Sequence, residues 1–200
     1  MSQLYTIIKV PDPILKEKTQ KLEDVNDSVT SQINRMIATM YDAPGIGLAA
    51  PQIGILNSIF VMDVPSDGWR YNGEDADGVM IVESAYRSGQ EEEEIPEDPN
   101  PTVMINPEII HESEKRSLFQ EGCLSIPGQY ADIIRPASVR VRYIDENGKK
   151  QEADYDGLPS HCVQHEIDHL NGVLFIDYLS SLKRNMMIKK VAKFTKQQVL

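Results

Sequence analysis

The first strong hydrophobic pattern along the chain is helical. Apolar side chains recur three or four positions apart between residues 28 and 42, behind the cap-forming residues Asp27 and Ser28. A stripe of this period forms one face of an amphipathic helix. We therefore predict a helix over 28–42 that Pro44 and Gly45 bring to an end. Its apolar face consists of Val29, Ile33, Met36, Ile37, Met40 and Tyr41.

Other segments have the patterns of β-strands. Residues 58–64 (SIFVMDV) form a short apolar run, which is typical of a buried strand, and residues 102–110 have a similar character. Residues 138–145 alternate between apolar and polar side chains. The Glu146-Asn147-Gly148 turn that follows predicts a hairpin to a second strand near 149–156.

Two more helices are expected in the C-terminal part of the chain. Pro159, in a first helical turn, opens a helix that runs to about Asn171 and ends at Gly172. A last helix covers about 180–197. Short antiparallel strands with helices at both ends of the chain predict an α+β fold, with antiparallel sheets packed around the central helix and a helix at the C-terminus.

The net charge of −11 comes mostly from one segment. Residues 66–100 hold eleven acidic and two basic side chains, which leaves a charge of −2 for the rest of the 200 residues. Such a segment cannot bury enough apolar surface to offset the entropy lost on ordering. We therefore expect one domain over residues 1–200, with an acidic surface insertion at about 65–101 and at most a short strand at 79–82.

The composition also bears on the compartment. No apolar run approaches the ~20 residues that a membrane-spanning helix needs, and the N-terminus has neither a signal nor a transit pattern. We expect a cytoplasmic, monomeric protein without a membrane partner. Two cysteines, Cys123 and Cys162, are too few for a disulfide scaffold, which favours catalytic, metal-bound or simply buried thiols.

The most specific signal for chemistry is His165-Glu166-Ile167-Asp168-His169, in the central helix. Residues four apart share one helical face, about 6 Å apart along the axis, so both imidazoles can bind one metal ion. Glu166 follows the first histidine and can reach a metal-bound water as a general base. The alternative is a pair of histidines on a polar helix face that bind no metal.

The third metal ligand indicates the class of enzyme. The metzincin pattern requires a histidine where this chain has Phe175, and residues 173–200 contain no His, Cys or Glu. A general metallopeptidase is therefore the weaker interpretation. Cys162 lies about 10.5 Å along the helix from His169, too far for one ion to contact both easily, and is expected to be a small buried residue. His161 is a poor ligand for similar reasons.

Cys123 is a reasonable third donor. It lies in Glu121-Gly122-Cys123-Leu124-Ser125, where the glycine lets the backbone approach a ligand closely. One cysteine and two histidines leave a fourth tetrahedral position open for water, as in catalytic sites. This mixed nitrogen and sulfur donor set accepts zinc, iron(II), cobalt or nickel, so it does not identify the metal.

Three phrases of the sequence together resemble the signature motifs of the peptide deformylases. They are Gly45-Ile46-Gly47-Leu48-Ala49-Ala50-Pro51-Gln52, Glu121-Gly122-Cys123-Leu124-Ser125 and Gln164-His165-Glu166-Ile167-Asp168-His169-Leu170. The similarity continues through Asp12-Pro13-Ile14-Leu15 and Leu174–Ser180, and covers the chain except for the acidic insertion. It implies a hydrolase that removes the N-formyl group from the formylmethionine of newly synthesised polypeptides and releases formate.

The resemblance also implies roles for individual residues. One divalent ion per chain, usually iron(II) in cells but replaceable by zinc, nickel or cobalt, would be held by Cys123, His165 and His169. Glu166 would move a proton from water to the leaving amine. The side-chain amide of Gln52 and the backbone N–H of Leu124 would stabilise the oxyanion.

A substrate site follows from the same resemblance. Gly47 and its neighbours would pair with the substrate backbone as an added strand. The methionine pocket would have Ile46, Leu124, Leu158 and Cys162 as walls. This chain has His161 where we expect an aliphatic pocket residue, and Tyr130 where the family often has arginine.

The predicted C-terminal helix suggests a further partner. From Tyr178 onward there are six basic residues and no acidic ones. We expect Met187, Ile188, Val191 and Phe194 to share one face, with lysines opposite. The family resemblance implies the ribosome as a partner of this helix. The alternative is a terminal helix packed on the core, with lysines that only keep it soluble. A catalytically silent homologue that only binds ribosomes or peptides is the remaining alternative, and the complete set of motif residues argues against it.

Overall fold

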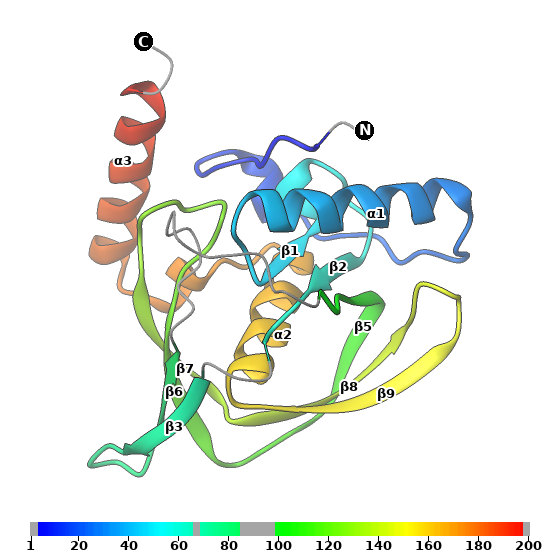
Figure 1. Ribbon diagram of the computed structural model, residues 1–200. Helices are drawn as coiled ribbons and strands as arrows, with labels where there is room; N and C mark the ends of the chain where they lie inside the picture. The colour runs from blue at the N-terminus through cyan, green and yellow to red at the C-terminus, as the bar shows by residue number, and fades with distance from the viewer. Residues whose placement is uncertain (1–3, 66–68, 85–98, 198–200) are drawn as a thin grey trace.

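The computed structural model describes residues 4–65, 69–84 and 99–197, with side chains to residue 194. Two sheets enclose one central helix, and further helices lie outside them (Figure 1). The predicted α+β class is confirmed. The elements are η1 (Pro13–Lys16), α1 (Asp27–Asp42), β1 (Gly47–Ala49), η2 (Ala50–Ile53), β2 (Ile59–Met62), β3 (Trp69–Glu74), β4 (Met80–Ser84), β5 (Thr102–Glu112), β6 (Arg116–Glu121), β7 (Ala131–Pro136), β8 (Ser138–Ile144), β9 (Lys150–Asp156), α2 (Gly157–Leu170), η3 (Phe175–Tyr178) and α3 (Ser181–Gln197).

Helix α1 covers the first sheet with the predicted apolar face. Ile33, Met36 and Met40 are buried in a cluster that also contains residues of β1, β2 and β5. The expected caps were wrong, because Asn26 caps the helix. Its backbone is extended and its side-chain oxygen accepts the N–H groups of the second and third helical residues at 3.0 and 3.2 Å, as an N-cap requires.

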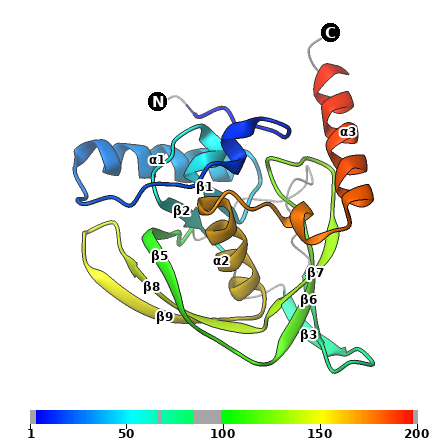
Figure 2. The same ribbon diagram turned by 180° about the vertical axis from the view of Figure 1, so that it is seen from behind.

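The first sheet has five antiparallel strands in the order β1-β2-β5-β8-β9, and it curves around α2 (Figures 1 and 2). The hairpin predicted between β8 and β9 is confirmed, with Gly148 at a φ of 77° in its turn. Strand β1, which belongs to the Gly45–Gln52 motif, lies at one edge of this sheet. Among the described residues, β1 therefore has a neighbouring strand on one side only.

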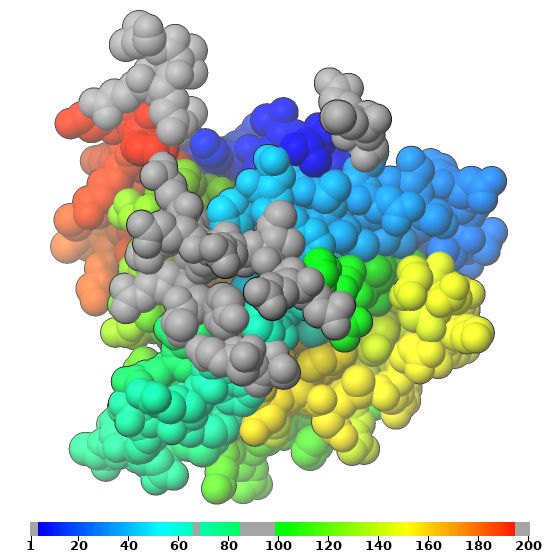
Figure 3. Space-filling view, in the orientation of Figure 1, coloured from blue at the N-terminus to red at the C-terminus, as the bar shows by residue number. Residues whose placement is uncertain are grey.

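The second sheet corrects our expectation for the acidic segment. The short strand expected at 79–82 is present as β4, but β3, with which it forms a hairpin, and the parallel pairing of β4 with β6 were not expected. The sheet order is β3-β4-β6-β7, and β4–β6 is the one parallel pair among the described strands, which are otherwise antiparallel as predicted. The hairpin, at the lower left of Figure 3, contacts the beginning of α2. The acidic run Glu91–Glu94 lies outside the described residues.

Trp69 explains why this part of the segment is ordered. Its ring packs so closely on Gly157, the first residue of α2, that a β-carbon at this glycine would overlap it. The hydroxyl of Tyr71 donates a hydrogen bond of 2.6 Å to Asp156. The partners of Trp69 and Tyr71 are distant from them in sequence, so the composition of the segment could not predict these contacts.

Helix α2 lies between the two sheets and carries the His-Glu-x-x-His motif (Figure 2). Helix α3 packs at one side of the molecule through the buried Val191 and the partly buried Met187 and Ile188. Phe194, which we placed on the same packed face, is 46% exposed because the helix extends beyond the core there. Among the described helices, none combines the length and apolar character needed to cross a membrane.

Candidate metal centre and active site

The structure brings Cys123, His165 and His169 together. The two histidines come from successive turns of α2, and Cys123 comes from the loop after β6. One ligand atom from each lies within 4.8 Å of the others. The Sγ atom of Cys123 is 3.1 Å from Nε2 of His169, and both residues are buried. Three convergent donors of this kind can hold one metal ion.

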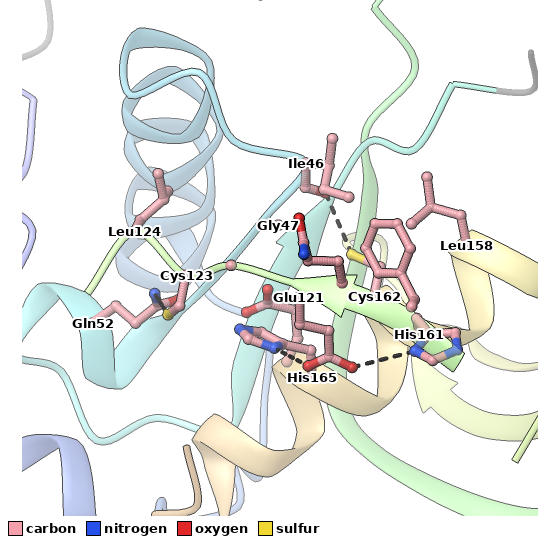
Figure 4. Close-up of a pocket in the computed structure, with 14 residues that line it drawn as sticks. Ile46, Gly47, Gln52, Glu121, Cys123, Leu124, Leu158, His161, Cys162 and His165 are labelled. Atoms are coloured by element: carbon pink, nitrogen blue, oxygen red, sulfur yellow. Dashed lines mark hydrogen bonds and ion pairs between the residues drawn. The ribbon is translucent and has the colours of Figure 1, made fainter. Parts of the chain in front are cut away.

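The carboxylate of Glu121 holds His165 in place and is itself held by Arg135. Arg135 donates to its two carboxylate oxygens at 2.6 and 3.0 Å, and Nδ1 of His165 lies 2.9 Å from Oε2 (Figure 4). Burial alone would raise the pKa of Glu121, but Arg135 and the neighbouring histidines outweigh it and hold the pKa well below its ordinary value. The ionised carboxylate therefore accepts the Nδ1–H of His165 and leaves Nε2 of this ring for a metal.

Glu166 is buried beside this group. Among the described residues, its Oε2 atom has no hydrogen-bond partner. Burial raises the pKa of Glu166 to about 7. A carboxyl group with such a pKa can both accept and return a proton near neutral pH, as proton transfer in catalysis requires.

Gln52 faces the metal donors from η2. Its Nε2 group donates to Oγ of Ser125 at 3.2 Å and lies 3.5 Å from Sγ of Cys123. Its Oε1 accepts the backbone N–H of Ala49 at 2.8 Å. Both ends of the amide are thus fixed, and its N–H donors point toward the same space as the metal ligands.

A pocket of about 530 Å³, counted to its mouth, opens beside these residues. All five residues that we predicted to contact substrate line it, and Figure 4 labels each of them. They are Ile46, Gly47, Leu124, Leu158 and Cys162.

Cys162 is a wall of this pocket and lies outside the group of metal donors. Its thiol donates to the backbone oxygen of Ile46 at 3.5 Å, and burial raises its pKa well above the ordinary value, so it stays neutral. His161 also lines the pocket and is fully buried. Tyr130 is absent from the described residues that form the lining.

Comparison with known proteins decides which family has this arrangement. The family model described as Polypeptide deformylase matches residues 4–185. The chain belongs to the peptide deformylase family. It is 45% identical to the peptide deformylase of Mesorhizobium japonicum over 192 residues, which is 96% of this chain and 93% of that protein. It is 46% identical to that of Novosphingobium aromaticivorans over 190 residues, covering 95% of this chain and 96% of the other.

Solved deformylase structures have the same fold. The crystal structure of peptide deformylase from Ehrlichia chaffeensis matches with a TM-score of 0.81 and 34% identity, covering 99% of this chain and 100% of that one. Another structure of the Ehrlichia enzyme, in complex with actinonin, matches with a TM-score of 0.78 and 35% identity over 95% of this chain and 96% of that one. Peptide deformylases are metal-dependent hydrolases. The convergent donors and the fixed ring of His165 fit that chemistry.

One part of this site that was not predicted from the sequence is the ionic network around Glu121. Arg135 is buried and also donates to Asp168 of the His-Glu-x-x-His motif at 2.8 Å, and the hydroxyl of Tyr178 donates to the same carboxylate at 2.9 Å. Glu121 and Asp168 both belong to motifs that we had recognised, so the missing element was their counterion. A single arginine in a strand gives no local sign that it is buried.

Proposed function

We propose that this protein hydrolyses the formamide bond of N-terminal formylmethionine in newly synthesised polypeptides and releases formate. One observation carries this proposal. The convergent Cys123, His165 and His169 lie beside a buried carboxylate and a fixed amide, at an apolar pocket. A site that combines a metal, a proton carrier and neutral hydrogen-bond donors suits amide hydrolysis.

Each part of the reaction has a residue in place. Cys123, His165 and His169 would hold the metal ion, which would supply Lewis-acid chemistry for the attack of water on the formyl group. Glu166 takes the proton from the attacking water and delivers it to the nitrogen as the carbon–nitrogen bond breaks. The amide of Gln52 and the backbone N–H of Leu124 donate to the oxygen on which negative charge develops.

Substrate binding follows from the place of β1 at the edge of its sheet. A peptide that pairs with Gly47 and its neighbours extends the sheet by one strand. Its first side chain then enters the pocket between Ile46, Leu158 and Cys162, which accepts a methionine. The free side of β1 supports this binding mode, because edge N–H and C=O groups need partners.

We propose iron(II) as the metal in cells. A thiolate with two imidazoles accepts iron(II), and both the iron and the thiolate can be oxidised. The iron-loaded protein should therefore lose activity in air much faster than the nickel-loaded protein. Equal half-lives for the two forms would argue against iron as the source of oxygen sensitivity.

Formate release tests the proposed reaction. A formyl-Met tripeptide should yield formate, with no cleavage of its internal peptide bonds. Glu166→Ala should retain the metal and lose about 10²–10⁴-fold in kcat, because Glu166 moves protons without binding the metal. Cleavage within the peptide would instead identify a general metallopeptidase, and an inactive, metal-loaded wild type would identify a silent homologue.

We also propose that α3 docks the protein on the ribosome. Lys189, Lys190 and Lys193 are exposed on this helix, which carries no acidic residue. Lys196 is a further lysine of this helix, and its side chain lies outside the described part. Lysines on one exposed surface can neutralise RNA phosphates, with an affinity that falls steeply as salt rises.

Charge reversal tests this docking. Lys189→Glu with Lys193→Glu should abolish co-sedimentation with ribosomes at low salt and leave formyl-Met-tripeptide turnover nearly intact. The control reverses Lys149 and Lys150, which are exposed at the β8–β9 hairpin. Equal losses in both double variants would show only a nonspecific effect of charge, and docking by α3 would be rejected.

A further inference from the structure

His161 is the unexpected residue in the wall of the substrate pocket. It replaces the aliphatic side chain that we expected, and only 1% of its surface is exposed. Its Nδ1 atom lies 3.2 Å from Oε1 of Glu121, and its Nε2 atom lies 2.9 Å from Oγ of Ser117 (Figure 4 shows the first contact). Both ring nitrogens therefore have partners inside the protein.

The partners also determine which nitrogen carries the proton. Glu121 is paired with Arg135 and accepts hydrogen bonds only, so Nδ1 of His161 must be the donor. In the neutral ring Nε2 then accepts a hydrogen bond from the hydroxyl of Ser117. Because neither nitrogen remains for a ligand, the ring offers the pocket its carbon surface.

Phe119 lies next to this ring on the same wall. The two ring centroids are 5.6 Å apart and the planes are inclined by 60°. Both residues line the pocket, and they come from different elements, β6 and α2. The thiol of Cys162, which also lines the pocket, donates to Ile46. The wall therefore places two rings beside aliphatic side chains, and the polar atoms of His161 and Cys162 have partners within the protein.

We propose that Phe119 and His161 make this pocket selective for a thioether side chain over a hydrocarbon side chain of the same shape. The proposal rests on the proposed deformylase function and adds what distinguishes methionine. Divalent sulfur makes favourable contacts with aromatic rings at about 5 Å, which a methylene group does not. A purely aliphatic pocket would favour norleucine at least as strongly, because a methylene is as apolar as sulfur.

Matched formylated tripeptides that differ only in methionine or norleucine at the first position test this selectivity. We expect the wild type to have a kcat/KM about 2- to 10-fold higher for the methionine peptide, the range that sulfur–ring contacts give. His161→Leu and Phe119→Leu should each bring this ratio closer to one. Leu158→Ile, which reshapes the same wall without removing a ring, should change the rates of both peptides alike and keep the ratio.

Two outcomes would overturn the proposal. One is a wild-type ratio of one or below, which needs no variant. The other is an unchanged ratio of kcat/KM for the two peptides in metal-loaded His161→Leu or Phe119→Leu. If His161→Leu does not fold, Phe119→Leu alone decides. Failure to release formate from either peptide would refute the proposed deformylase function itself. This result is distinct from the two outcomes above, in which formate is released.

Discussion

At the scale of single residues, the absence of a side chain at position 47 matters as much as any group that is present. A β-carbon on Gly47 would overlap the carboxylate of Glu166 and come within 2.9 Å of its Cδ atom and 3.1 Å of Sγ of Cys162. The glycine thus lets β1 lie directly against the carboxylate of Glu166. This gives the second glycine of the Gly-Ile-Gly phrase a steric reason that its sequence context did not reveal.

Gly47→Ala should therefore displace Glu166. We expect kcat to fall about 10²-fold with metal content unchanged, because a misplacement of about 1 Å at a catalytic group has this effect. Gly45→Ala is the control in the same loop, since its β-carbon would meet only the end of the Leu124 side chain, 2.7 Å away, which can rotate. Equal losses in both variants would attribute the effect to the loop instead.

The two cysteines have different surroundings. Cys123 contacts His169, whereas Cys162 faces the pocket and Ile46. Cys123→Ala should lose metal affinity first and activity with it. Cys162→Ala should keep the metal and much of the activity, as measured by elemental analysis and kcat. Loss of metal in the Cys162 variant alone would reverse our assignment of the ligands.

At the scale of elements, Arg135 holds the site together. It lies on β7 and binds Glu121 at the end of β6 and Asp168 on α2, so one guanidinium joins α2, which carries His165 and His169, to the strand that precedes Cys123. The guanidinium and Glu121 are almost completely buried. Removal of the arginine would leave the buried carboxylate of Glu121 without this counterion, which costs more than an exposed ion pair contributes.

Arg135→Ala should lower the free energy of unfolding by about 3–5 kcal/mol, measured by urea denaturation. Arg140 provides a matched control, since it also binds one carboxylate, Asp154, through two nitrogens, but at the surface. Arg140→Ala should leave stability within experimental error, as exposed ion pairs contribute little. A small loss of stability in Arg135→Ala would mean that water solvates the two carboxylates in place of the guanidinium.

At the scale of the whole molecule, the metal donors come from two elements that are distant in sequence, and only folding brings them together. A metal that binds the folded protein and not the unfolded chain stabilises the fold, by about 2.7 kcal/mol when its concentration is 100 times Kd. Chelation should therefore lower Tm in the wild type. Cys123→Ala should show a smaller shift, and an unchanged wild-type Tm would separate metal binding from folding.

The sequence by itself determined the features that depend on neighbouring residues. The period of apolar residues predicted α1, and the start and stop residues Pro159 and Gly172 predicted α2, because both signals depend on neighbouring residues. The Asn-Gly turn predicted the β8–β9 hairpin for the same reason. Helical spacing placed His165 and His169 on one face, and the motif phrases indicated the family.

Only the tertiary structure decided the features that depend on contacts between distant segments. Trp69 orders an acidic hairpin because Gly157 offers it a flat surface, and local composition does not encode that surface. Both ring nitrogens of His161 are bound by Glu121 and Ser117, so the ring presents its carbon atoms to the pocket. The burial of Arg135 likewise depends on two carboxylates from other elements. Burial and hydrogen-bond partners are properties of the packed chain, so no local pattern could predict them.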